Sequence, residues 1–179
     1  ILFNRDLPTT FVYKKSSFVL SKSSNKEEVM HTAMGQGKTQ ITPLHLNMVT
    51  GAIANKGVMM KSYVVDHLEN NDGSVVRQYE PKTSENIMTE DEAKVLTNFM
   101  KEVVSSGTAT SLSNFSYAVA GKTGSAEYDA SGSSHAWFTG FAPADNPKIA
   151  VTIVVEGMGT GSEYAVPIAK RIFQSYLGN

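Results

Sequence analysis

The densest group of residues that could do chemistry is Gly121-Lys122-Thr123-Gly124-Ser125, which places one lysine, two hydroxyls and two glycines within five positions. A lysine ammonium and hydroxyl groups can hold a carboxylate or a phosphate through charge-assisted hydrogen bonds. Glycine leaves a strand surface bare, so that another backbone can approach closely. The pattern predicts an anion-binding strand, and an ordinary glycine-rich strand or turn is the alternative that these five residues leave open.

A nucleotide-binding domain is a further alternative, because Gly-Lys-Thr occurs twice, at 37–39 and 121–123. A phosphate-binding loop requires another glycine five residues before its second one. Counting back from the two glycines reaches Thr32 and Ser116 instead. Neither copy leads directly into a convincing helix, so the sequence argues against a phosphate-binding loop.

The remaining composition excludes several other kinds of site. The chain has no cysteine, which excludes disulfides, thiol catalysis and cysteine-ligated metals. The histidines lack the His-x-x-x-His spacing of a metal site, so we expect neither a metal nor a cofactor. Lysine and arginine (16) nearly balance aspartate and glutamate (17), giving a net charge of −1. This balance argues against a nucleic acid partner, because nucleic-acid-binding domains carry a basic excess.

Three helices and several strands must position the anion-binding strand. The spacing of apolar residues predicts helices over 42–56, 89–107 and 162–177. The second helix begins with a capping box formed by Thr89 and Glu92. Pro167 lies inside the third helix and predicts an irregular first turn. A chain of 179 residues is long enough for one domain, in which these helices would cover the sheet.

Strand signals fill the spaces between these helices. Two strands in 58–80 surround an Asp-Gly turn, and three more strands are predicted over 117–127, 136–142 and 148–156. The last has apolar residues on both faces, which predicts a central strand covered on both sides. Residues 1–40 are polar and poorly periodic, which predicts a loop-rich segment. The fold class is therefore α+β, with a mostly antiparallel sheet and helices packed on both faces.

The motif Lys122-Thr123-Gly124-Ser125 resembles the Lys-Thr-Gly-Thr/Ser motif of penicillin-binding transpeptidases and serine β-lactamases. From about residue 30 onward, the chain looks like the C-terminal portion of a class B penicillin-binding protein transpeptidase domain, which has the β-lactamase/transpeptidase-like fold. The segments that carry this resemblance stand in the expected order: Gly35-Gln36-Gly37, Thr42-Pro43-Leu44, Ala52-Ile53-Ala54-Asn55-Lys56-Gly57, Gly107-Thr108-Ala109 and His135-Ala136-Trp137-Phe138-Thr139-Gly140-Phe141-Ala142-Pro143.

The resemblance implies a peptidoglycan DD-transpeptidase that forms a serine acyl-enzyme, cross-links stem peptides and binds β-lactams. It implies that Lys122 and the hydroxyls of Thr123 and Ser125 orient the terminal carboxylate of a D-Ala-D-Ala stem peptide or of a β-lactam. The backbone N–H of Ser125 would be one oxyanion donor, so Lys122 and Ser125 are the catalytic candidates. Gly124 would let the stem peptide lie along the strand as an added β-strand.

The family also requires a Ser-x-x-Lys nucleophile motif and a Ser-x-Asn motif. Ser23-Ser24-Asn25-Lys26 fits both patterns, and Ser84-Glu85-Asn86 fits the second. We reject them, because the family's motifs lie far upstream of Gly-Gln-Gly and one serine cannot fill two sites. The chain also begins at Ile1 without an initiator methionine. We therefore expect residues 1–179 to be the C-terminal part of one domain, inactive alone, whose nucleophile lies upstream.

The parent protein is expected at the extracytoplasmic face of the bacterial membrane, anchored by an N-terminal segment outside this sequence. Its expected partners are the D-Ala-D-Ala stem peptide, β-lactam antibiotics and the rest of its own domain. A degenerate relative is the alternative: a module that binds β-lactams or muropeptides, or scaffolds cell-wall assembly, without catalysis. The two hypotheses differ in whether an upstream Ser-x-x-Lys and Ser-x-Asn exist.

Overall fold

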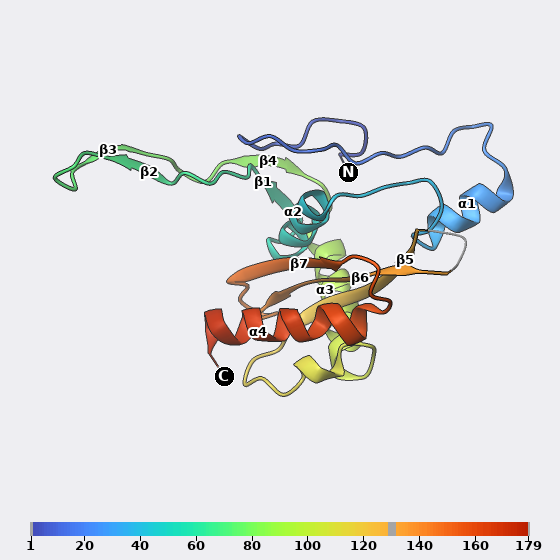
Figure 1. Cartoon of the computed structure of the whole chain (residues 1–179). Helices are drawn as coiled ribbons and strands as arrows, with labels where there is room; N and C mark the ends of the chain where they lie inside the picture. The colour runs from blue at the N-terminus through green and yellow to red at the C-terminus, as the bar shows by residue number, and fades with distance from the viewer. Residues whose placement is uncertain (1, 129–131, 179) are drawn as a thin grey trace.

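The body of the protein is built on a three-stranded antiparallel sheet, seen in a computed structural model that describes residues 2–128 and 132–178 (Figure 1). The strands are β5 (Ala120–Glu127), β6 (Ser134–Ala142) and β7 (Ile149–Val155), in the spatial order β5-β6-β7. Each pairs with the next in an antiparallel ladder. The three strands predicted over 117–127, 136–142 and 148–156 are therefore confirmed, with shifts only at their ends.

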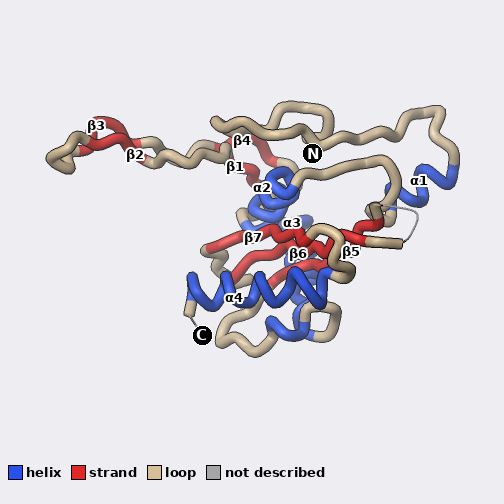
Figure 2. The backbone as a smooth tube through the Cα atoms, in the orientation of Figure 1, coloured by secondary structure: helices blue, strands red, loops and turns tan. Residues whose placement is uncertain are grey.

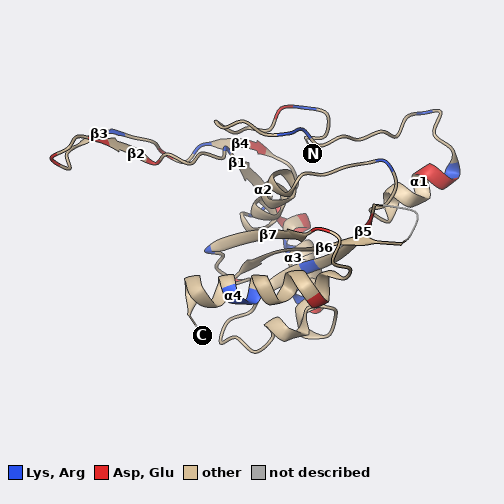
Figure 3. Ribbon diagram, viewed as in Figure 1, with Lys and Arg blue, Asp and Glu red and all other residues tan. Residues whose placement is uncertain are grey.

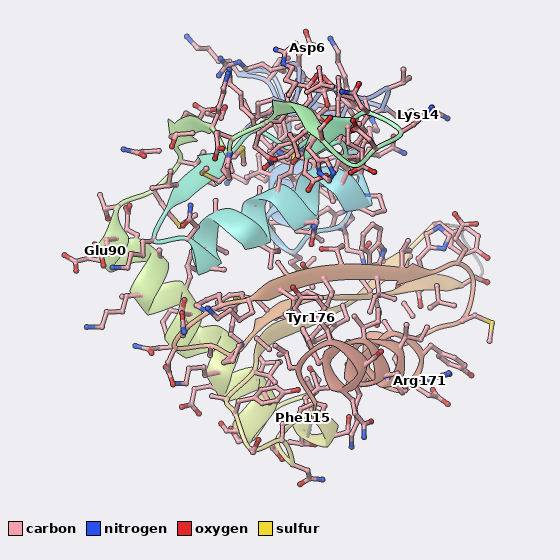
Figure 4. The ribbon with its side chains drawn as sticks, turned by 90° about the vertical axis from the view of Figure 1, so that its left-hand side faces the viewer. Asp6, Lys14, Glu90, Phe115, Arg171 and Tyr176 are labelled. Atoms are coloured by element: carbon pink, nitrogen blue, oxygen red, sulfur yellow. The ribbon has the colours of Figure 1, made fainter. Side chains whose placement is uncertain are left out.

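Helices cover both faces of this sheet, as the side view of Figure 4 shows. Helices α2 (Pro43–Ala54) and α3 (Glu90–Ser105) pack on one face, and α4 (Val166–Leu177) packs on the other. A five-residue π-helical turn, η2 (Gly161–Ala165), precedes α4. The predicted irregular start of the helix over 162–177 is confirmed, because its first turn is this π-helical turn and the regular α-helix begins only at Val166, beside Pro167. The predicted fold class, α+β with helices on both faces, is also confirmed.

Two aromatic groups form the core on the two sides of the sheet. On the α4 face, Phe138 and Phe173 are fully buried and meet edge to face, with their ring centroids 6.5 Å apart. On the opposite face, Phe141 is fully buried and packs with Met100 of α3 and Ala120 of β5. Burial of one such side chain contributes about 1.5–3 kcal/mol, so these contacts hold the helices against the sheet.

Residues 58–86 leave this body as a long two-stranded ribbon, here called the β-arm (Figure 1). Its base pairs β1 (Val58–Met60) with β4 (Thr83–Asn86), and its outer part pairs β2 (His67–Glu69) with β3 (Val75–Gln78). The predicted turn between two strands is confirmed at the tip. The arm has four short strands rather than two, paired in two separate ladders, and each ladder also contains a register shift.

The first 40 residues are mostly loop, as predicted and as Figure 2 shows, but they contain one helix that the sequence pattern missed. Helix α1 (Lys26–Ala33) starts at Asn25, whose side chain accepts from the Glu28 N–H while the Glu28 carboxylate accepts from the Asn25 N–H. None of the helix's residues is buried. Without a buried face there is no apolar periodicity, so only the capping box could have indicated this helix.

Within the described residues, β7 lies at the edge of the sheet with β6 as its strand neighbour, so the prediction that residues 148–156 form a central strand would need a second neighbour from outside this sequence. Both faces of β7 are nevertheless covered, as predicted. Val151, Ile153 and Val155 face the α4 side, and Ala150 packs on the side of α2 and α3. Helices therefore account for apolar residues on both faces, and the pattern does not report the number of neighbouring strands.

No helix in residues 2–128 and 132–178 combines the length and the apolar character needed to cross a membrane. Figure 3 shows charges of both signs along the β-arm and α1.

Candidate functional site

Strand β5 presents the predicted anion-binding residues in a fixed register against β6. Lys122 lies opposite Thr139, and Gly124 lies opposite Trp137. Since successive side chains of a strand alternate between faces, Thr123 and Ser125 lie on the α4 face and Lys122 on the other. The Lys122 side chain accordingly borders a largely apolar pocket of about 350 Å³ between the sheet and helices α2 and α3. The Lys-Thr-Gly-Ser sequence thus offers groups to both sides of one strand.

The outer edge of β5 carries no strand in the described chain, and two donors from outside β6 reach its carbonyls. Lys122 Nζ donates to the carbonyl oxygen of Thr123 at 2.7 Å, and Gln36 Nε2 donates to that of Ser125 at 3.4 Å. In an antiparallel strand, the N–H and C=O of one residue point to the same side. The Ser125 N–H therefore faces the open edge beside its carbonyl, where an added strand or an oxyanion could accept from it.

Glycines allow close packing at the middle of this strand. A Cβ on Gly121 would lie 2.6 Å from Cε2 of the buried Phe138 ring. On the same side, Gly161 at the start of η2 sits against the β5–β6 backbone, and a Cβ there would lie 2.7 Å from the Gly124 carbonyl oxygen. These contacts fix β5 from the α4 side, so the open edge is held by a rigid support.

Hydroxyl groups tie α2 to the sheet on the face that carries Lys122. Thr139 Oγ1 lies 2.6 Å from both Thr50 Oγ1 of α2 and Thr152 Oγ1 of β7. Thr152 also donates to Asn47 Oδ1 at 3.2 Å. Because Thr139 is the strand partner of Lys122, this network holds the backbone opposite the lysine in place.

Two residues near β5 were not identified as site residues from the sequence. Thr108 Oγ1 lies 2.6 Å from Thr123 Oγ1, and Gln36 reaches Ser125 as described above. Both belong to short segments that carry the family resemblance, Gly107-Thr108-Ala109 and Gly35-Gln36-Gly37. The two segments could therefore be recognised in the sequence, but their spacing gives no indication that they contact β5.

The rejected nucleophile motifs have structural roles. The Ser23 hydroxyl lies 2.8 Å from Ser21 Oγ, and Asn25 caps α1. Ser84 belongs to β4, which pairs with β1 at the base of the β-arm. Local turn and cap geometry therefore accounts for Ser23 and Asn25, and strand pairing accounts for Ser84.

The other Gly-Lys-Thr copy, at 37–39, makes contacts within the chain. Lys38 forms an ion pair of 3.3 Å with Glu28 of α1. The N–H of Asn25, followed by Lys38, lowers the pKa of the Glu28 carboxyl below its ordinary value. Lys38 therefore forms an ion pair with a carboxylate of this chain, at the surface beside α1.

Histidines and acidic residues form no group of three or more that could hold a metal ion among the described residues. His135 illustrates how one of these side chains is used. Its Nδ1 accepts from the Gly157 N–H at 3.0 Å, and its ring stacks on Tyr128 with the centroids 4.3 Å apart. His135 therefore fastens the end of the β5–β6 hairpin to the turn after β7.

Comparison with known proteins places these features in a family. The model of the penicillin binding protein transpeptidase domain matches residues 4–174. The chain is 32% identical over 170 residues to the peptidoglycan D,D-transpeptidase MrdA of Haemophilus influenzae, covering 84% of this chain and 26% of the relative. It is 31% identical over 157 residues to the peptidoglycan D,D-transpeptidase PbpA of Mycolicibacterium smegmatis, covering 82% of this chain and 31% of the relative.

Solved structures agree in fold. A ceftriaxone acyl-enzyme complex of penicillin-binding protein A from M. tuberculosis superposes with a TM-score of 0.83 at 26% identity, covering 92% of this chain and 38% of that one. Pseudomonas aeruginosa PBP2, in complex with WCK 5153, gives a TM-score of 0.69 at 31% identity, covering 85% and 34%. The chain spans about a quarter to a third of the length of the curated relatives named above. It belongs to the penicillin-binding protein transpeptidase domain family.

Proposed function

We propose that this chain supplies the substrate-binding strand of a peptidoglycan D,D-transpeptidase that also reacts with β-lactams. The observation that carries the proposal is the open edge of β5, which displays the Ser125 N–H beside the Lys122 ammonium and the Thr123 hydroxyl. An unpaired strand edge binds an extended peptide through its main chain. A cation and hydroxyls next to that edge suit a peptide that ends in a carboxylate.

The proposed reaction is acyl transfer through a serine ester. The stem peptide lies along β5, and its terminal carboxylate is held by Lys122 and the hydroxyls of Thr123 and Ser125. The nucleophilic serine adds to the carbonyl carbon between the two D-alanines, and the Ser125 N–H donates to the oxyanion that forms. The C–N bond then breaks, and the terminal D-alanine leaves with a proton on its nitrogen. An amine from a second stem peptide then attacks the ester carbonyl, the C–O bond to the serine breaks as the cross-link forms, and the serine oxygen takes a proton that the amine loses.

We also propose that residues 1–179 are the C-terminal part of the transpeptidase domain and that the nucleophile precedes Ile1. The much greater length of the relatives supports this placement, as do the structural roles of Ser23 and Asn25. Without that serine, the chain by itself is expected to be inactive. The whole protein would act at the extracytoplasmic face of the membrane, anchored by a preceding segment, because its peptidoglycan substrate lies there.

The direct test treats the longest native form of the protein with benzylpenicillin and locates the adduct by intact and peptide mass spectrometry. We expect one penicilloyl group on a serine upstream of Ile1. An adduct on Ser23 would contradict the proposed location of the nucleophile. If no adduct formed, the degenerate module that binds muropeptides or scaffolds cell-wall assembly would replace the enzyme as the better proposal.

A further inference from the structure

The turn Gly107-Thr108-Ala109 follows α3 and has a backbone that is fixed on both sides of the threonine. A Cβ on Gly107 would lie 2.8 Å from Val103 Cα, so only glycine lets the chain turn this tightly over the last turn of the helix. The Ala109 N–H donates to the Val103 carbonyl at 3.1 Å, and the Ala109 side chain is buried. Thr108 is therefore presented from a rigid support, although its own side chain is exposed.

The hydroxyl of Thr108 meets the hydroxyl of Thr123, the two oxygens being 2.6 Å apart. A threonine hydroxyl has one hydrogen to donate and can accept from others, so only one of the two can donate in this contact. If Thr123 donated to Thr108, its hydrogen would be used within the protein. If Thr108 donates, the hydrogen of Thr123 remains free for an acceptor outside.

A bound carboxylate fixes the direction of this contact, because an ionised carboxylate can only accept. As long as the contact between the two hydroxyls is kept, Thr123 can donate to the carboxylate only when Thr108 donates to Thr123. The two bonds then form a chain from Thr108 through Thr123 to the carboxylate, and each bond of such a chain strengthens the next.

We infer that Thr108 is a positioning residue that orients the Thr123 hydroxyl toward the ligand carboxylate and so contributes to selection of acyl donors that carry a free carboxylate. This inference rests on the proposed transpeptidase function and adds to it a residue that acts through Thr123. Each residue of this segment then has a physical role. Gly107 permits the tight turn, Thr108 supplies the hydroxyl, and the buried Ala109 anchors the segment.

The test compares acylation of the native full-length protein by benzylpenicillin and by its methyl ester, which lacks the ionised carboxylate. For each variant the quantity measured is the ratio of the two acylation rate constants. Thr108→Val removes the hydroxyl at nearly constant shape, and Thr108→Ser keeps it. Thr110→Val is the matched control, since Thr110 is exposed two residues away and its hydroxyl has no hydrogen-bond partner assigned within residues 2–128 and 132–178.

We expect Thr108→Val to lower the acid-to-ester ratio about fivefold, the size of one net hydrogen bond. Thr108→Ser and Thr110→Val should keep the ratio of the unmodified protein. An unchanged ratio in Thr108→Val, or equal slowing with both compounds, would overturn the inference and leave the proposed function standing. If the unmodified protein reacted with neither compound, the proposed function would fail and the inference with it.

Discussion

The sheet β5-β6-β7 and the β-arm are both antiparallel, yet they are stabilised in different ways. Phe138 and Phe141 of the sheet are fully buried between helices. On the arm, Val64 is 76% exposed, Val76 63% and Val75 57%. A two-stranded ribbon without a packed face is marginally stable by itself, whereas a sheet with covered faces draws its stability from apolar burial.

The difference shows where a site that depends on exact placement can be built. The candidate residues of the sheet lie on a strand whose other contacts are buried, so their backbone is fixed although Lys122 and Ser125 are exposed. The outer part of the arm, β2 with β3, has ion pairs and turns at its surface but no buried side chain, whereas at the base of the arm Met59 is buried against Met48 and Ala52 of α2. An exposed side chain can therefore be held in an exact position only where the backbone that carries it is fixed by buried contacts.

The largest effect is expected from truncating the core of the sheet. Phe138→Ala should lower the free energy of unfolding by about 3–5 kcal/mol, because it leaves a cavity against Phe173 and α4. Phe99→Ala is the control, since Phe99 is 65% exposed and should cost far less. Urea unfolding measures both. Equal losses would mean that the sheet is not the stabilising centre of the molecule.

A large effect on chemistry without an effect on folding is expected at Lys122. Lys122→Ala in the full-length protein should slow β-lactam acylation roughly a hundredfold, because it removes a preorganised positive charge from the site. The urea midpoint should stay unchanged, since Lys122 is exposed. Lys94→Ala, an exposed lysine of α3, should change neither quantity. Unchanged acylation kinetics in Lys122→Ala would remove the lysine from the proposed site.

Two histidines should make the arm and the body respond to pH in opposite directions. Asp66, then Glu69, raises the pKa of His67 on the arm above its ordinary 6.5. Its stabilising charge is therefore present below that value and is lost as the pH rises through the raised pKa. Burial lowers the pKa of His45 in α2, whose ring nitrogens have no partner within the described residues. The body should therefore lose stability as the pH falls below 6.5.

Hydrogen exchange at about pH 5.5 and 7.5, corrected for intrinsic rates, would resolve these two trends. Amides of β2 and β3 should exchange more slowly at the lower pH, and amides of α2 more slowly at the higher one. His67→Gln should abolish only the trend on the arm. Parallel trends in both regions would contradict the contrast between the two histidines.

The smallest effect is expected from apolar side chains of the arm. Val75→Ala should change the free energy of unfolding by at most about 0.5 kcal/mol, because the side chain is mostly exposed. Val151 of β7 is a buried valine, so Val151→Ala is the matched comparison and should lower the free energy of unfolding by more. A similar cost at both positions would indicate that the arm packs against something in solution.

Burial decided which elements could be predicted from the sequence. Helix α3 was found because Thr89 and Glu92 cap it and its apolar residues recur at helical spacing, and among them Met100 and Val104 are buried. Helix α1 has the same kind of cap but no buried residue, so it left no periodic pattern. The pairing of β1 with β4 was missed for another reason. It joins residues more than 20 positions apart, and local propensity carries no information on such pairs.

The sequence indicated which residues form the candidate site, but not which contacts they make. The resemblance named Lys122 to Ser125, and their roles stay proposals. The contacts of Thr108 with Thr123 and of Gln36 with Ser125 join residues 15 and 89 positions apart. They follow from how α3 and the loop before α2 are packed, which is a property of the folded molecule.

The edge position of β7 has a practical consequence for work on the chain in isolation. Within the described residues, no strand occupies the outer edge of β7. Unpaired apolar edge strands act as templates on which further copies assemble. We therefore expect the 179-residue chain to self-associate as its concentration rises. A dilution series belongs before any assay on it, so that loss of material to aggregates is not mistaken for the effect of a substitution.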